Sequence, residues 1–407
     1  MKKKKVLWIA AFSIILIILY LFYIFFDKNK LENQGNDRRE HKKVITMIVP
    51  YLSIEHNDFF KQLCTQYERI HKDIEVKIEY ISRENYKKEI CLKQDEKETV
   101  DIIICDRSIM LPLIQMNMFQ PFPIEQWKNK IQNDFLLESV MYHGKYYGLP
   151  LTIDPYVLFY NTQMLSSFNE LPSKWSTIVE QCRHRKSAGR YFFAFPSGQA
   201  DETAKLCLLL LSTQGGILNG SSEEKYEQVY YSLQELYQEK AIPPNMMNMN
   251  SNDLCKEFVW GNVGMMLNRY SVLQKIKDEK LNFEMKIHPL SSEISDCYFF
   301  TGDNIGLSIG ASEEAKEFLN YLLSEEQYSK FCKEMGVFSV WEQRNSTLKE
   351  WNWLDMQSKN LPVHEVWFDI SDILAESVYE CFQTDAKPPK EMSKNTMDFV
   401  KTAIFER

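Results

Sequence analysis

The chain is 407 residues long and carries a formal net charge of -8. An acidic chain of this kind is not expected to bind nucleic acid, and its length exceeds what one hydrophobic core supports. The nine cysteines are scattered without a Cys-x-x-Cys pair, so most are expected to be buried as small apolar side chains. No metal-binding helix motif, P-loop or dinucleotide fingerprint occurs, and the sequence therefore predicts neither a metal nor a cofactor.

The N-terminus carries a membrane-targeting pattern. Lys2 to Lys5 precede an uncharged run from Val6 to Phe26. A run of about 20 apolar residues spans the ~30 Å hydrocarbon core of a bilayer. A cleaved signal peptide is the alternative, but this run is long and ends in bulky residues that suit cleavage poorly. We therefore expect an uncleaved anchor at 1–27, a polar linker at 28–43, and the rest of the chain outside the membrane.

The first folded stretch alternates strands and helices. Strands are predicted at 44–49, 74–80 and 100–105, with an amphipathic helix at 57–70. This order predicts an α/β lobe with a parallel sheet, in which ligands bind outside the carboxyl ends of the strands. Asp106 and Arg107 follow the third strand. They are candidate ligand-binding residues, and the alternative is that they cap the following helix.

The segment from Gly144 to Asn161, GKYYGLPLTIDPYVLFYN, joins two apolar runs through a polar turn. A carboxylate between two buried runs needs a partner, because an unpaired buried charge is costly. One interpretation is a simple Asp-Pro turn. The other is that the chain crosses here from one lobe to a second, with Asp154 and the neighbouring Tyr156 facing a crevice.

Four motifs, in order along the chain, resemble those of the sugar-binding, maltose-binding-protein-like group of extracellular solute-binding proteins of ABC importers. They are Tyr147-Gly148-Leu149-Pro150 with the strand after it, the strand 101–105 running into Asp106-Arg107, the stretch Phe258 to Tyr270, and the Gly-rich strand Gly302 to Gly310. The resemblance implies two lobes, each a mixed sheet flanked by helices. It also implies lobe 1 at 44–153, lobe 2 at 154–301, a return to lobe 1 at 302–335, and a helical tail on lobe 2 at 336–407.

The resemblance also implies which residues bind the ligand. Tyr270 falls on an aromatic position that stacks on a sugar ring, and Trp341 lies near another aromatic that reaches the ligand. Arg269 is unusual at its position, and if it faces the ligand an anionic sugar becomes attractive. The full set of expected ligand-binding residues is Asp106, Arg107, Asp154, Tyr156, Ser197, Arg269, Tyr270, Asp303, Asn304 and Trp341.

The predicted function is therefore a membrane-anchored, monomeric binding protein that is not an enzyme. It would capture a sugar or sugar derivative between hinged lobes and deliver it to an ABC permease. A sensor that presents the ligand to a receptor kinase is the alternative. An extracellular hydrolase is a remote one, because Gly306-Leu307-Ser308-Ile309-Gly310 fits a nucleophile elbow. That elbow requires the serine on a turn leading directly into a helix, whereas the helix is expected only near Ser312.

Overall fold

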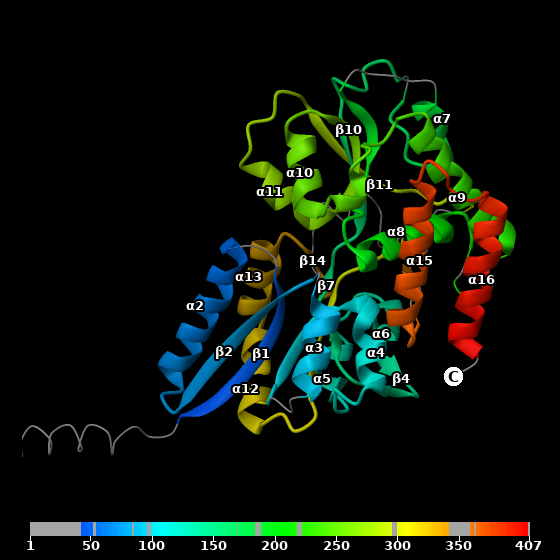
Figure 1. Ribbon diagram of the computed structural model, residues 1–407. Coiled ribbons are helices and arrows are strands. Elements are labelled where there is room, and N and C mark those ends of the chain that lie inside the picture. The colour runs from blue at the N-terminus through cyan, green and yellow to red at the C-terminus, as the bar shows by residue number, and fades with distance from the viewer. Residues whose placement is uncertain are drawn as a thin grey trace, which may run out of the picture.

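The computed structural model describes residues 42–405 except 52–53, 84, 96–98, 169, 184–188, 217, 219–221, 295–298, 342–358 and 362–363. These residues form two lobes, one above the other in Figure 1, joined by strands that run between them. Among the described residues, no helix is both long and apolar enough to cross a bilayer. The predicted anchor and nearly all of the predicted linker lie outside the described residues.

Lobe 1 is built on a five-stranded mixed sheet with the order β2-β1-β3-β13-β6. The strands are β1 Lys43–Tyr51, β2 Ile74–Ser82, β3 Ile102–Asp106, β13 Asp303–Leu307 and β6 Leu149–Pro150. β1 is parallel to β2 and β3, as the strand-helix alternation predicts. β13 returns from the other lobe and pairs antiparallel with β3 and β6. The sheet is therefore mixed. The chain leaves lobe 1 after β6 and returns to it at β13, and both strands belong to this sheet.

Helices cover both faces of this sheet. They are α2 Ile54–Ile70, α3 Tyr86–Asp95, η1 Arg107–Ile109, α4 Met110–Gln115, α5 Glu125–Lys128, α6 Phe135–Glu138, α12 Glu313–Leu322 and α13 Glu325–Met335, with the short hairpin β4 Met141–Tyr142 and β5 Lys145–Tyr146. In α2 the apolar residues Phe59, Leu63 and Tyr67 recur at helical spacing and are all buried. The amphipathic pattern read from the sequence thus places this helix against the core.

Lobe 2 contains a four-stranded sheet with the order β11-β8-β10-β9. Its elements are β8 Tyr156–Asn161, β9 Tyr191–Ala194, β10 Val263–Arg269, β11 Met285–Pro289, α7 Trp175–Cys182, α8 Ala200–Thr213, α9 Glu223–Gln238, η2 Met246–Asn248, α10 Ser251–Val259, η3 Tyr270–Val272 and α11 Leu273–Lys277. β8 and β10 are buried along their whole length, which matches their nearly continuous apolar sequence. Trp260 follows the end of α10 and is 67% exposed.

The lobes are joined by a small hinge sheet, in which β7 Thr152–Ile153 pairs antiparallel with β14 Phe338–Ser339. In a third connection the chain runs back from lobe 2 through β12 Phe299–Phe300 into β13. β12 pairs with β15 Lys359–Asn360. Gly302 lies between β12 and β13, where this connection passes Thr152 of β7. Its φ is +153°, and a Cβ there would lie 2.1 Å from the Thr152 carbonyl oxygen, so only glycine fits.

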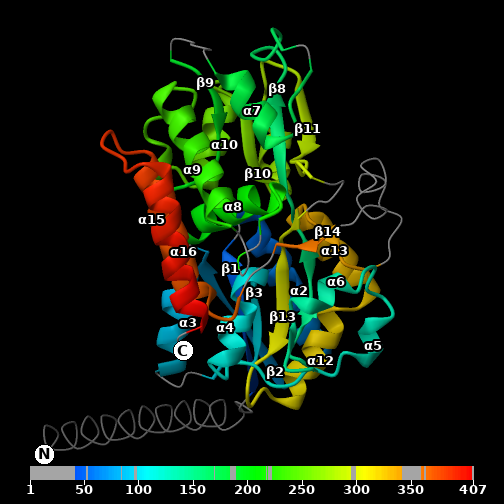
Figure 2. The same ribbon diagram turned by 90° about the vertical axis from the view of Figure 1, so that its right-hand side faces the viewer.

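Two helices follow the hinge, α15 Trp367–Cys381 and α16 Pro389–Phe405. α15 packs on α8 and α9, and α16 packs on α9. Figures 1 and 2 show both helices along one side of the molecule, where they extend past the level of the hinge toward lobe 1. The Lys87 ammonium of α3 reaches α15 from lobe 1, 2.9 Å from the Phe368 carbonyl oxygen and 3.2 Å from the Asp372 carboxylate.

Candidate functional site

The carboxyl ends of lobe 1 strands and the start of α8 in lobe 2 face each other across a cleft. β3 ends at Asp106, and Arg83 follows β2 directly. β13 begins at Asp303 because it runs in the opposite direction. From lobe 2, β10 ends at Arg269, and α8 contributes Glu202 from its first turn. The topology therefore brings charged side chains of both lobes to one place.

Asp106 is the centre of this arrangement. Its Oδ2 atom lies 2.8 Å from Arg269 Nη2, 3.0 Å from Lys205 Nζ and 3.3 Å from Arg83 Nη1. Its Oδ1 atom accepts hydrogen bonds from the Ser108 backbone and hydroxyl, so Asp106 also caps η1. Burial alone would raise the pKa of Asp106, but Lys205, Arg269 and Arg83 hold that pKa well below its usual range.

Glu202 forms the lobe 2 side of the same cluster. Its carboxylate accepts hydrogen bonds from Arg269 at 2.7 Å and from the Tyr156 hydroxyl at 2.5 Å, and Lys205 lies 3.4 Å away. Burial opposes ionisation, yet Arg269 and Lys205 outweigh it and lower the pKa of Glu202 to about 2. Tyr156, a predicted ligand-binding residue, is buried here. It holds Glu202 in place and lies with its ring 5.6 Å from the Arg269 guanidinium carbon.

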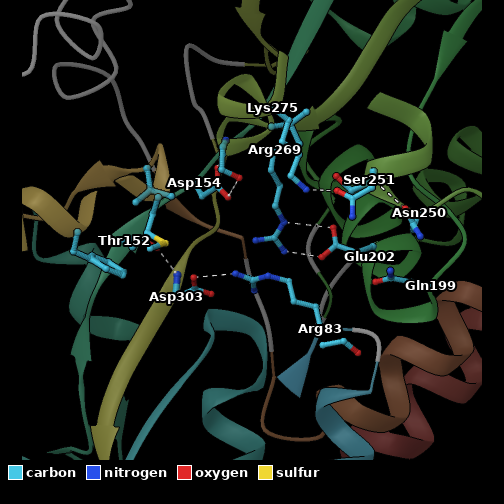
Figure 3. Close-up of a pocket in the computed structure, with 17 residues that line it drawn as sticks. Arg83, Thr152, Asp154, Gln199, Glu202, Asn250, Ser251, Arg269, Lys275 and Asp303 are labelled. Atoms are coloured by element: carbon cyan, nitrogen blue, oxygen red, sulfur yellow. Dashed lines mark hydrogen bonds and ion pairs between the residues drawn. The ribbon is translucent and has the colours of Figure 1, made fainter. Parts of the chain in front are cut away.

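Figure 3 shows Arg269 reaching down from lobe 2 and Arg83 crossing toward Asp303 on the opposite side. Arg83 Nη2 donates to Asp303 at 2.9 Å. Within the described part of the chain, two buried atoms of this site have no hydrogen-bond partner, Arg269 Nη1 and Asp303 Oδ1. An unpaired donor of lobe 2 and an unpaired acceptor of lobe 1 therefore remain among the residues that line the cleft.

Asp154 lies at the hinge and lines the same cleft. Its carboxylate accepts hydrogen bonds from the Ser271 backbone at 2.9 Å and from the Ser271 hydroxyl at 2.8 Å. Burial raises its pKa, while Arg269 and these hydrogen bonds act in the opposite direction. Asp154 thus connects the first crossing strand to the segment that follows β10, which agrees with the crossing interpretation of Gly144–Asn161.

The other predicted ligand-binding residues lie elsewhere. Arg107 donates to Asn360 at 3.0 Å and to the Thr152 carbonyl oxygen at 2.7 Å, and burial lowers its pKa to about 10. The Ser197 hydroxyl donates to the Met246 carbonyl oxygen at 2.8 Å. These contacts hold the hinge and the lobe 2 interior, and neither residue lines the cleft.

Tyr270, Asn304 and Trp341 also lie outside the cleft lining. Tyr270 stacks on Phe338 of the hinge sheet with ring centroids 4.4 Å apart. The Asn304 side chain is fully buried in lobe 1 and contacts Ser139. Trp341 is buried in lobe 1, where its ring stacks at 5.7 Å on the ring of Trp127. The structure therefore brings together Asp106, Asp154, Tyr156, Arg269 and Asp303, and separates the remaining five.

Sequence reasoning missed Arg83, Glu202 and Lys205. Arg83 follows a strand of the parallel sheet, so the carboxyl-end rule that singled out Asp106 applies to it equally. Glu202 and Lys205 lie three residues apart in a helix that is otherwise largely apolar. Charged residues on a buried helix face require charged partners. The occurrence of Glu202 and Lys205 in a largely apolar helix was therefore the sequence signal that could have identified them.

The hydrolase alternative has no support in the geometry. The Ser308 hydroxyl donates to the Val100 carbonyl oxygen, and α12 begins only at Glu313. Ser308 therefore does not stand on a turn that leads directly into a helix, as a nucleophile elbow requires. Among the described residues, no group of histidine, cysteine, aspartate or glutamate could hold a metal ion, and the described cysteines form no disulfide with one another.

Two hinged lobes with a polar cleft between them define a two-lobed solute-binding fold. The chain belongs to the family of bacterial extracellular solute-binding proteins, whose family model matches residues 62–352. No curated protein matches the sequence significantly.

Solved structures of binding proteins share the fold. Maltose-bound MalE3 of T. maritima is 16% identical, with a TM-score of 0.76 over 88% of this chain and 99% of that one. The GacH receptor of Streptomyces glaucescens, solved unliganded and with acarbose, is 15% identical, with a TM-score of 0.76 over 89% and 98%. Lmo0181 of Listeria monocytogenes, an ABC substrate-binding protein in complex with cycloalternan, is 16% identical, with a TM-score of 0.74 over 89% and 99%.

Proposed function

We propose that this protein captures a sugar or sugar derivative between its lobes and delivers it to an ABC permease. The observation that carries the proposal is that two buried polar atoms of the residues lining the cleft, Arg269 Nη1 and Asp303 Oδ1, have no hydrogen-bond partner. A hydroxyl group can both donate and accept a hydrogen bond, so neighbouring hydroxyls on one molecule would satisfy both atoms. Such a ligand would favour closure of the lobes to the extent that it binds the closed form more tightly than the open form.

The charge balance of the cleft favours a neutral ligand. The charged side chains that line it beside the hinge are the cations Arg83, Arg269 and Lys275 and the carboxylates Asp154, Glu202 and Asp303. Arg269 faces two carboxylates, Glu202 and Asp106, within 2.8 Å. An anionic sugar would have to compete with these carboxylates, so Arg269 does not favour an anionic ligand even though it faces the cleft.

The remaining parts of the proposal rest on the family and the N-terminal sequence. Family membership supports an extracytoplasmic binding protein without catalytic activity. The uncharged run at 6–26 would anchor it, with the lobes outside the membrane, and we expect a monomer. A permease is the partner that the structurally similar ABC transporter binding proteins suggest.

The test is a thermal-shift screen of the purified chain against neutral monosaccharides, oligosaccharides, polyols and uronates. A ligand at about 100 times its dissociation constant adds ~2.7 kcal/mol to the free energy of unfolding, which raises the melting temperature measurably. A hit among neutral sugars is expected. A response to uronates alone would contradict the neutral-ligand argument, and silence across the whole panel would contradict sugar capture.

A further inference from the structure

The cleft between the lobes is divided into two chambers. The hinge-side chamber has a volume of about 150 Å³ and is lined by Thr152, Asp154, Ser271, Lys275 and Val337, among others. The tail-side chamber has a volume of about 340 Å³ and is lined by Tyr86, Lys87, Phe368, Ser371 and Asp372, among others. Among the described residues, the walls of the two chambers share only Arg83 and Gln199.

The ion-pair cluster is the partition between them. Arg269 lines the hinge-side chamber and pairs at 2.8 Å with Asp106, which lines the tail-side chamber. Glu202 of the hinge-side chamber likewise lies 3.4 Å from Lys205 of the tail-side chamber. The shared residue Arg83 joins Asp303 on one side to Asp106 on the other. The Arg269–Asp106 and Glu202–Lys205 pairs therefore cross from one chamber wall to the other, and Arg83 links the two walls.

The partition is buried, and contacts with neighbouring residues hold it in place. The Lys205 side chain is 1% exposed and also pairs with Asp201, which accepts a hydrogen bond from the Trp367 indole at 2.8 Å. Tyr156 braces Glu202 from within lobe 2. Removing one partner of a buried pair leaves an uncompensated charge, so a ligand that passes between the chambers must break costly contacts.

The hinge-side chamber has room for one ring. A protein cavity of about 150 Å³ holds a molecule as small as benzene. The unpaired atoms of Arg269 and Asp303 also belong to residues that line this chamber and not the other. We propose, resting on the proposed sugar-binding function, that the ion-pair partition restricts the ligand to a single sugar or polyol unit bound in the hinge-side chamber.

The experiment compares affinities for one unit and for two. Isothermal titration calorimetry of the purified full-length chain would use glucose, xylose, ribitol and tagatose beside maltose, cellobiose and xylobiose. We expect at least one single-unit ligand to bind, and its linked dimer to bind at least about 100-fold more weakly, because the dimer must break a buried pair. A dimer that binds as tightly as its unit would overturn the partition while leaving sugar capture intact. Absence of binding across the panel would overturn the proposed function as well.

Variants locate the restriction. In Lys205→Met the buried ammonium is removed without changing the lining of the hinge-side chamber, and the preference for one unit should fall by about tenfold or more. The double variant Asp106→Asn with Lys205→Met removes one charge of each sign and serves if the single variant does not fold, as judged by circular dichroism. Lys205→Arg, which keeps the charge, and Lys87→Ala, which alters only the tail-side chamber, should keep the preference. An unchanged preference in both partition variants would overturn the proposal.

Discussion

Asp106 shows how a single side chain can serve two structural purposes. One carboxylate oxygen caps a short helix of its own lobe, and the other meets cations of both lobes. The sequence placed Asp106 at a strand end, but whether it capped a helix or faced the cleft was left open. The structure shows both arrangements at once, because the two oxygens point to different partners.

At Glu202 we predict a large loss of stability when the charge is removed. Glu202→Gln would leave the buried cations Arg269 and Lys205 short of a carboxylate, and breaking a buried pair costs about 3–5 kcal/mol. Urea unfolding monitored by tryptophan fluorescence measures the change. Glu235→Gln, which alters a pair with the more exposed Arg183, is the matched control and should change stability far less. A loss equal to that of the control would show that Glu202 is not held as the structure indicates.

At the scale of elements, the helices and strands with strong periodicity were predictable. The strands and helix expected at 44–49, 57–70, 74–80 and 100–105 all occur. The two-lobed fold came from motif resemblance and not from periodicity. What the sequence could not supply was the side-chain direction at strand ends, and this is why Ser197 and Asn304 were expected in the cleft but are buried inside the lobes.

The tail helix α15 is predicted to support the partition through Trp367. Its indole is fully buried and donates to Asp201, which pairs with Lys205. Trp367→Phe should cost about 1–3 kcal/mol for one hydrogen bond to a charged group, and Trp367→Ala about 3–5 kcal/mol because it also leaves a cavity. Chemical denaturation measures both. Phe399→Ala on α16, where the ring is 60% exposed, should stay within about 0.5 kcal/mol. Equal losses for all three variants would contradict this role of α15.

At the scale of the whole molecule, lowering the pH should reduce the stability of the folded state over a defined pH range. The pKa of Glu202 is lowered from 4.5 to about 2 in the folded state, so its contribution is present above pH 4.5 and is lost as the pH falls through about 2. The loss is on the order of 3 kcal/mol, and Asp106 acts in the same direction. Asp154, whose pKa is raised, acts in the opposite direction. Melting temperatures from pH 6 to pH 2 should fall most steeply below pH 4.5 in the wild type, and less steeply in Glu202→Gln. Parallel curves for the two proteins would contradict the assignment.

The cluster also connects the lobes, which gives a prediction about their opening. Asp106 is the carboxylate of lobe 1 that meets Lys205 and Arg269 of lobe 2. Without it, the guanidinium of Arg83 in lobe 1 would face these two cations across the cleft without the carboxylate that they share, and like charges repel. The substitution Asp106→Ala should therefore shift the ligand-free protein toward an open form. Small-angle X-ray scattering should then show a larger radius of gyration than in the wild type.

The matched control for this opening is Asp253→Ala. Asp253 is a carboxylate that pairs at 3.3 Å with Lys256 in the same helix of lobe 2, so its loss removes an ion pair without touching the contact between lobes. Its radius of gyration should equal that of the wild type. Addition of a bound sugar should restore compaction in Asp106→Ala only partly, because a neutral ligand cannot supply the missing charge. An unchanged radius of gyration in ligand-free Asp106→Ala would mean that the hinge strands, and not the ion pairs, set the distance between the lobes.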